Sequence, residues 1–259
     1  MVPLSGDTVS LDGKGALVTG GGSGLGQACA VAMAKAGARV MIADVNEAGG
    51  TETVKLVEEA GSEADFVRTD VTDEAQVIDM VDATVARWGG LDCAVNNAGT
   101  TGPNGFTADY TLEQWNATIG LNLTGVFLCL KYEIPKMVEG GGGAIVNMAS
   151  GAGLMGFAGL PAYVASKHGV VGITRAAALE YAKQNIRINC ICPGSTRTPM
   201  LEGFMGGDAN IERMMTQGVP LGRLGRPSEI GEAAAWLCSD AASFVLGHAM
   251  AVDGGSVIQ

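Results

Sequence analysis

Short runs of apolar and β-branched residues alternate along the chain with longer segments whose apolar residues recur at helical spacing. The short runs predict strands and the longer segments predict helices. Strands are expected at residues 15–19, 39–43, 64–69, 91–95, 144–148, 186–192 and 249–252. Helices are expected from the glycines after residue 19 to residue 36 and at 47–59, 73–88, 112–137, 162–183 and 227–239. This alternation predicts an α/β fold, a doubly wound parallel sheet of roughly seven strands with helices on both faces.

No linker, composition break or internal repeat divides this alternation, so residues 1–259 are expected to form a single domain. One excursion, at about residues 198–219, interrupts the rhythm with mixed apolar, glycine and methionine residues. Long excursions after a strand often cover a functional site. The methionines favour an adaptable apolar surface for a substrate, although a helix packed for stability would show the same residues.

The composition excludes several classes of protein. Of 259 residues, 47% are hydrophobic and 17% are charged, which excludes a disordered chain. The formal net charge is −11 and lysine and arginine form no cluster, so no nucleic-acid partner is expected. Residues 1–14 do not resemble a signal peptide, and the uncharged stretch at 140–166 contains too many glycines and polar residues for a membrane span.

Cysteine and histidine usage points to an intracellular protein without a metal. Six cysteines lie mostly in apolar stretches without a Cys-x-x-Cys pair, so we expect free thiols in a reducing compartment, the cytoplasm. The two histidines, His168 and His248, are far apart in the sequence, and no metal site is expected.

A glycine-rich turn follows the first expected strand and opens a helix. Gly20, Gly24 and Gly26 do not match the Gly-x-Gly-x-x-Gly spacing, and no lysine follows them as in a P-loop. Glycines here allow a phosphate to approach the helix N-terminus, and a tight turn without a ligand is the alternative. Asp44 ends the second strand, where an acid can bind the ribose hydroxyls of a dinucleotide; capping of the next helix is the other interpretation. Together the turn and the acid favour a dinucleotide site.

A series of short motifs occurs in a fixed order: Thr19-Gly-x-x-x-Gly24-x-Gly26, Asp70, Asn96-Asn97-Ala98-Gly99, Asn122, Ser150, Tyr163-x-x-x-Lys167 and Pro193-Gly194. Each motif alone is weak, but the ordered set resembles the short-chain dehydrogenase/reductase family, in its single-domain subgroup of about 250 residues. The resemblance covers essentially the whole chain. It implies a Rossmann fold and an oxidoreductase with a nicotinamide cofactor.

The resemblance also implies which residues bind the cofactor. Asp70 and Val71 would flank the adenine, and Pro193, Gly194 and Thr198 would lie near the nicotinamide. The full expected set is Gly20, Ser23, Gly24, Leu25, Gly26, Asp44, Val45, Asp70, Val71, Asn97, Ala98, Gly99, Tyr163, Lys167, Pro193, Gly194 and Thr198. Asn-Ala-Gly and Pro-Gly are also common in plain turns, so a purely structural interpretation stays open for these segments.

Tyr163 and Lys167 lie four residues apart on an expected helix and therefore share one face. Tyrosine is a poor base near neutral pH, but a neighbouring ammonium lowers its pKa. We expect Tyr163 to exchange a proton with an alcohol or carbonyl as hydride moves, with Lys167 assisting. A surface pair of no catalytic importance is the alternative.

Two more residues complete the expected catalytic set. Ser150 is expected to hydrogen-bond the substrate oxygen, and the resemblance implies that Asn122 holds a water in a proton relay. A turn cap for Ser150 and a satisfied buried amide for Asn122 are the alternatives. The substrate is expected to contact Ser150, Ala152, Tyr163 and Met205.

These expectations predict an NAD-dependent alcohol dehydrogenase or ketone reductase (EC 1.1.1.-) for a small secondary alcohol or ketone. NAD is favoured because Asp44 would repel the 2′-phosphate of NADP, while Ser23 and Val45 are not basic. Two alternatives stay open. One is a non-catalytic NAD-binding scaffold protein, and the other is a 3-oxoacyl-type carbonyl reductase that would use Arg197, Arg213, Arg223 and Arg226.

A homotetramer is also expected. The helices at 112–137 and 162–183 carry apolar residues such as Val170, Ile173 and Ala177 beyond those that one sheet face requires. Members of the family resembled commonly pair these helices across two-fold axes.

Overall fold

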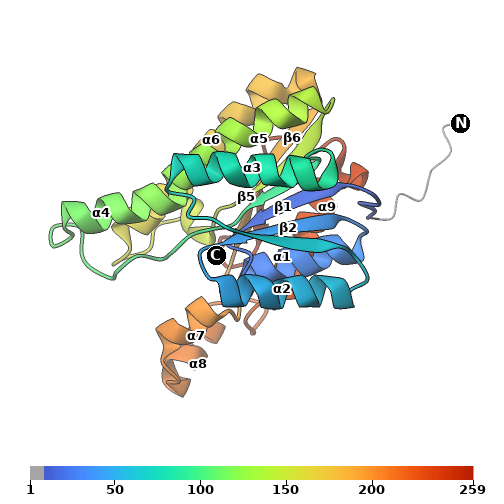
Figure 1. Cartoon of the computed structure of the whole chain (residues 1–259). Helices are drawn as coiled ribbons and strands as arrows, with labels where there is room; N and C mark the ends of the chain where they lie inside the picture. The colour runs from blue at the N-terminus through green and yellow to red at the C-terminus, as the bar shows by residue number, and fades with distance from the viewer. Residues whose placement is uncertain (1–8, 259) are drawn as a thin grey trace, which may run out of the picture.

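The computed structural model describes residues 9–258 and contains a seven-stranded sheet in which neighbouring strands are parallel (Figure 1). The strands are β1 (Gly15–Thr19), β2 (Arg39–Asp44), β3 (Ala64–Arg68), β4 (Cys93–Asn96), β5 (Gly143–Met148), β6 (Ile186–Pro193) and β7 (Ala249–Val252). Their order, β3-β2-β1-β4-β5-β6-β7, reverses direction between β1 and β4. Doubly wound sheets bind ligands at such a switch point, beyond the carboxyl ends of the strands. The predicted fold class is confirmed.

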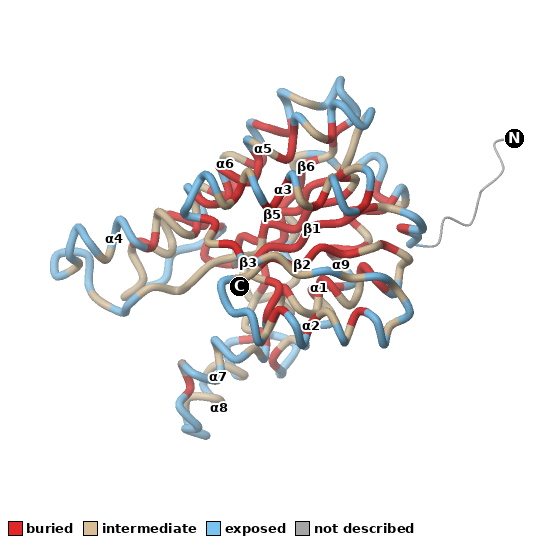
Figure 2. Tube along the Cα trace, viewed as in Figure 1, coloured by how far each residue is buried: buried red, intermediate tan, exposed pale blue. Residues whose placement is uncertain are grey.

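Helices cover both faces of the sheet and bury it between two apolar clusters (Figure 2). On one face lie α1 (Gly24–Lys35), α2 (Glu47–Glu59) and α9 (Pro227–Cys238), and on the other lie α3 (Glu74–Trp88), α5 (Gly125–Glu139) and α6 (Pro161–Tyr181). Successive strand residues point to opposite faces. Leu17 therefore belongs to the cluster beneath α3, α5 and α6, while Ala16 and Val18 belong to the cluster beneath α1, α2 and α9.

The long helix expected at residues 112–137 has an interruption. It consists of α4 (Leu112–Ile119), a π-helical turn at Gly120–Thr124, and α5. A capping box between Thr111 and Gln114 begins α4. The π-helical turn adds a residue to the spacing of the helix, which changes the direction of the side chains that follow. Apolar periodicity does not reveal such a turn, because the flanking segments are ordinary α-helix.

The excursion after β6 forms two short helices, α7 (Pro199–Met205) and α8 (Ala209–Gln217), which project from the body of the molecule (Figure 1). Thr198 caps α7 and Asp208 caps α8 through hydrogen bonds to backbone N–H groups. Arg197 pairs with Glu202 on α7 and with Glu212 on α8. This segment is thus an ordered helical pair held by charge, as well as a break in the strand–helix rhythm.

Short 3₁₀ turns join the remaining elements at Gly151–Gly153, Ala182–Gln184 and Asp240–Ala242. Within residues 9–258, no helix combines the length and apolarity that a bilayer-spanning segment needs.

Candidate functional site

The glycine turn between β1 and α1 packs tightly against the segment that follows β4. Gly20 has a φ of +62°, and a Cβ there would lie 2.8 Å from the Cα of Ala98. A Cβ on Gly26 would overlap the carbonyl oxygen of Gly20. Ser23 is the exposed N-cap of α1 and makes no side-chain cap hydrogen bond. The turn therefore excludes side chains at two positions and leaves the positive end of α1 without a side-chain cap.

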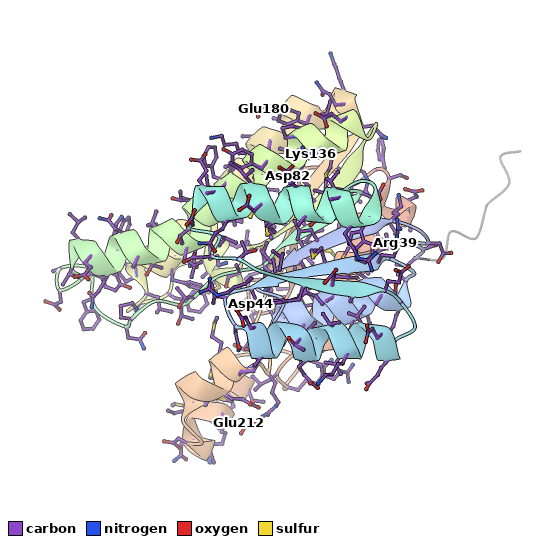
Figure 3. All side chains as sticks on the ribbon, in the orientation of Figure 1. Arg39, Asp44, Asp82, Lys136, Glu180 and Glu212 are labelled. Atoms are coloured by element: carbon purple, nitrogen blue, oxygen red, sulfur yellow. The ribbon has the colours of Figure 1, made fainter. Side chains whose placement is uncertain are left out.

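Asp44 points from the end of β2 toward this turn (Figure 3). Its Oδ2 accepts a hydrogen bond from Gly22 N at 2.8 Å, and its Oδ1 accepts one from Asn46 N at 2.9 Å. The side-chain cap of α2 is Asn46, which accepts from Gly49 N. The interpretation of Asp44 as the helix cap is thus wrong. A carboxylate has about four acceptor sites, so Asp44 retains capacity for further donors.

The segment after β4 is tied to the glycine turn through Thr19 and Asn97. The Thr19 hydroxyl accepts hydrogen bonds from Asn97 N at 3.0 Å and Ala98 N at 3.2 Å. The Asn97 amide donates to the carbonyl oxygens of Thr19 and Gly20 at 3.1 and 3.0 Å. Gly99 lies deeper, since a Cβ there would be 3.0 Å from Asn122 Oδ1 and 3.5 Å from Lys167 Nζ. These contacts bring the expected cofactor residues beside the expected catalytic residues.

Asp70 and Val71 follow β3 at the same end of the sheet. The Asp70 carboxylate accepts hydrogen bonds from Thr72 N at 2.9 Å and from the Thr72 hydroxyl at 2.7 Å. Val71 is buried, and a Cβ on Gly125 would lie 2.9 Å from its side chain. Asp70 is therefore hydrogen-bonded within the segment after β3, and Val71 packs against the start of α5.

Tyr163, Lys167 and Ser150 converge from α6 and the end of β5. The Lys167 ammonium is buried, lies 5.7 Å from the centre of the Tyr163 ring, and donates to the carbonyl oxygen of Met148 at 2.8 Å. Ser150 hydrogen-bonds the Tyr163 side chain, and its Oγ accepts from Ala152 N at 3.1 Å. Ser150 thus caps a short turn, as its structural interpretation requires, and also contacts the tyrosine.

Burial dominates the electrostatics of this group. It raises the pKa of Tyr163, and the hydrogen bond with Ser150 offsets only part of that rise. Burial also lowers the pKa of Lys167 to about 8. The expectation that Lys167 depresses the tyrosine pKa is therefore wrong for the protein alone. Removal of the Tyr163 hydroxyl from water is the largest influence on its pKa.

Asn122 lies in the π-helical turn and is completely buried. Its side chain closes a pair of hydrogen bonds with the backbone of Thr100, each 2.8 Å long, and donates to the hydroxyl of Ser166 at 3.1 Å. The Ser166 hydroxyl in turn donates to the carbonyl oxygen of Tyr163 at 2.7 Å. The side chain of Asn122 is thus a satisfied buried amide that links the segment after β4 to α6.

Pro193, Gly194 and Thr198 leave the end of β6 close to the glycine turn. Gly194 packs on Asp253, because a Cβ there would lie 2.7 Å from its Cα. A Cβ on Gly24 would lie 3.5 Å from Thr198 Cβ. Thr198 also caps α7 through Leu201 N. The start of the α7–α8 excursion therefore lies beside the N-terminus of α1.

The residues expected to contact a substrate differ in exposure. Tyr163 is partly exposed, whereas Ala152 and Met205 are buried at 2% and 5% exposure. The methionines that α7 and α8 expose are Met200 and Met214.

Several residues that organise the site had no role assigned from sequence. They are the Thr19 hydroxyl, Ser166, and Thr53, whose hydroxyl donates to Gly21 O at 2.9 Å. Glu133 is the clearest omission, because it is an acid between apolar neighbours on α5 and is completely buried. A charged residue on the apolar face of a helix is the signal that would have identified it.

Comparison with known proteins gives consistent matches over most of the chain. A family model described as enoyl-(acyl carrier protein) reductase matches residues 20–256. The 2,5-dichloro-2,5-cyclohexadiene-1,4-diol dehydrogenase of Sphingobium indicum is 44% identical over 246 residues, which is 95% of this chain and 97% of that protein. The cis-4-hydroxycyclohexanecarboxylate dehydrogenase of Sinomonas cyclohexanicum is 44% identical over 240 residues, 93% of this chain and 95% of that one.

A solved structure agrees with these matches. The crystal structure of levodione reductase has a TM-score of 0.92 and 39% sequence identity, and the match covers 95% of this chain and 98% of that chain.

Proposed function

The chain belongs to the short-chain dehydrogenase/reductase family, and on that premise we propose that it is an NAD-dependent dehydrogenase of secondary alcohols on six-membered carbon rings. One observation carries the proposal: Tyr163, Ser150 and Lys167 converge beside the glycine turn, at the switch point of the sheet. The two curated relatives named above are dehydrogenases whose names specify ring alcohols, which supports the substrate class.

The residues around the glycine turn fit a dinucleotide. The turn has no room for a side chain at Gly20 or Gly26, and no side chain caps the N-terminus of α1, so a pyrophosphate can approach the backbone there. Asp44 retains acceptor capacity for ribose hydroxyls. When bound, NAD supplies the hydride acceptor and a positively charged ring.

The protein's own residues bind the substrate oxygen and accept its proton. The side chain of Ser150 holds the alcohol oxygen, and the Tyr163 phenolate takes the hydroxyl proton. Because burial raises the pKa of Tyr163, the phenolate needs a nearby positive charge. The oxidised nicotinamide ring would supply that charge, with Lys167 nearby: because the pKa of Lys167 is about 8, its ammonium is still mostly protonated at neutral pH.

Charge pairing around the excursion favours a small substrate over an acyl-carrier protein. The guanidinium groups there are paired with carboxylates, Arg197 with Glu202 and Glu212, and both Arg223 and Arg226 with Glu229. Arg213 donates to Asn210. An acidic carrier would have to compete with these internal partners, which weakens the 3-oxoacyl reductase alternative.

The preference for NAD rests on Asp44, with one neighbour that sequence reasoning missed. Neither Ser23 nor the exposed Val45 is basic, so neither can bind a 2′-phosphate as a cation. The Arg39 guanidinium already donates to Gly13 O and Trp88 O, at 3.0 Å each. Arg68, however, is paired in register with Asp44 across β2 and β3. It contacts Glu47 at 3.8 Å, and this partner reduces its attraction for a 2′-phosphate.

Steady-state kinetics with cyclohexanol and cyclohexane-1,4-diol test the proposal, with NAD and NADP each followed by nicotinamide absorbance. We expect turnover with both alcohols and a kcat/KM for NAD at least about tenfold above that for NADP. Asp44→Ala combined with Val45→Arg should narrow or reverse the ratio. Binding of NADH without turnover of any ring alcohol would favour a scaffold protein. Equal use of both cofactors by the unmodified protein would refute the role of Asp44.

A further inference from the structure

A series of hydrogen-bonded polar side chains is buried along one face of the sheet, between the strands and the helices α5 and α6. Glu133 on α5 accepts a hydrogen bond at Oε2 from Asn96 Nδ2 at 2.9 Å, and Asn96 Nδ2 also donates to Asn147 Oδ1 at 3.1 Å. Asn147 Nδ2 then donates to the hydroxyl of Thr174 on α6 at 2.9 Å. All four side chains are at most 1% exposed. The series thus joins α5, β4, β5 and α6 through the interior.

This series of side chains lacks hydrogen-bond donors at the end where Glu133 and Asn96 lie. Glu133 Oε1 and Asn96 Oδ1 are both buried acceptors without a partner. They belong to two residues that already share the hydrogen bond from Asn96 Nδ2 to Glu133 Oε2. In the part of the chain that the structure describes, no ion pair reaches Glu133 to compensate a negative charge. A buried carboxylate under these conditions is costly.

We propose that Glu133 is a neutral carboxylic acid in the folded protein, whose hydroxyl hydrogen on Oε1 is donated to Asn96 Oδ1. One proton then satisfies both unpartnered atoms, because an acid and a primary amide can form a cyclic pair with two hydrogen bonds. No electron transfer or co-reactant is involved; at pH values between 4.5 and about 7, Glu133 takes up one proton from water on folding. The direction of its pKa, which burial raises to about 7, agrees with this assignment.

The position of the pair gives it a role in the site. Asn96 directly precedes Asn97, which holds the glycine turn, and Asn147 lies three residues before Ser150. Thr174 lies on α6, about two helical turns after Lys167. Glu133 acts through these neighbours, so it is a positioning residue: the neutral acid holds the ends of β4 and β5 in position relative to α6.

Comparing Glu133→Gln with Glu133→Leu distinguishes the effect of the hydrogen bonds from the effect of side-chain size. Glutamine can accept from Asn96 Nδ2 and donate to Asn96 Oδ1, so it reproduces the cyclic pair without an ionisable group. Leucine removes both hydrogen bonds. Met137→Ala, one turn further along α5 and also fully buried, is the matched control, because it creates a cavity without touching the polar series.

The first measurement is infrared difference spectroscopy of the unmodified protein against Glu133→Gln at mildly acidic pH. We expect the unmodified protein to show the carbonyl band of a protonated carboxylic acid that the variant lacks. Loss of a carboxylate band instead would overturn the proposal. This readout does not depend on cofactor or substrate, so it stands even if the proposed function fails.

The second measurement is NADH affinity by fluorescence titration together with the kcat–KM split, and this part rests on the proposed function. We expect Glu133→Gln to bind NADH like the unmodified protein. Glu133→Leu should bind at least about tenfold more weakly while still folded by circular dichroism. Met137→Ala should lose stability but keep its affinity. Unchanged NADH affinity in Glu133→Leu, or an equal loss of affinity in Glu133→Gln, would overturn the positioning role. If Glu133→Leu does not fold, the Glu133→Gln affinity and the infrared spectra test the proposal.

Discussion

At the scale of single residues, the proton carrier is the most direct test of the chemistry. Tyr163→Phe keeps the ring but removes the hydroxyl that contacts Ser150. We expect turnover to fall by roughly 100-fold or more while NADH affinity is retained, because proton transfer is lost but the glycine turn is intact. Stopped-flow and steady-state rates with a ring alcohol measure the loss. Unchanged turnover would show that a group other than Tyr163 accepts the proton.

A second prediction at this scale concerns Glu133 and pH. Burial raises its folded pKa from 4.5 to about 7, so the folded state holds a proton that the unfolded state has released between these values. The contribution of Glu133 to stability is therefore full below pH 4.5 and declines as pH rises through 7, by up to about 3 kcal/mol. Glu133→Gln cannot ionise, so urea unfolding should show it gaining stability relative to the unmodified protein between pH 5 and pH 8. A stability difference that does not change with pH would contradict the assignment.

At the scale of elements, the packing of the glycine turn determines where α1 begins. Gly26→Ala would place a methyl group against the carbonyl oxygen of Gly20 and the amide of Asn97. We expect a loss of about 1–3 kcal/mol in the free energy of unfolding and a marked loss of NADH affinity. Gly203→Ala on α7, where a Cβ would meet nothing within 4 Å, is the control and should be neutral or slightly stabilising. Equal effects of the two changes in chemical denaturation would show that the turn tolerates a side chain.

Strands with a continuous apolar run were predicted close to their observed bounds. Arg39–Asp44, Gly143–Met148 and Ile186–Pro193 are buried strands whose apolar runs require a sheet covered on both faces. The π-helical turn at Gly120–Thr124 was not predicted, because it depends on how the Asn122 amide pairs with Thr100 across the fold. Apolar periodicity records which face is buried, but not a local change in helical spacing.

At the scale of the whole molecule, the expected homotetramer stays a prediction, but part of its basis was wrong. Val170 and Ala177 are buried within the chain itself, in the cluster beneath α6. The apolar side chains left for a partner are different ones, including Phe127, Leu179 and Phe244. Burying such residues between copies gives an apolar contribution to association.

Light scattering at micromolar protein measures the assembly. We expect a tetramer mass for the unmodified protein and a smaller mass for Phe127→Glu, since a buried charge without a partner opposes association. Lys55→Glu on α2, whose exposed side chain contacts Glu52, is the surface control and should keep the tetramer mass. A monomer mass for the unmodified protein would refute the tetramer.

The sequence by itself determined the strand–helix order, the doubly wound sheet and the residues of the glycine turn, because these follow from local periodicity and from motifs that are short in sequence. It also placed Tyr163 and Lys167 on one helical face, since four residues span about one turn. Only the tertiary structure decided their electrostatics, because burial depends on what the rest of the chain removes from water. It also revealed the hydrogen-bonded polar side chains from Glu133 to Thr174, which lie on α5, β4, β5 and α6 and meet only when these helices pack on the sheet.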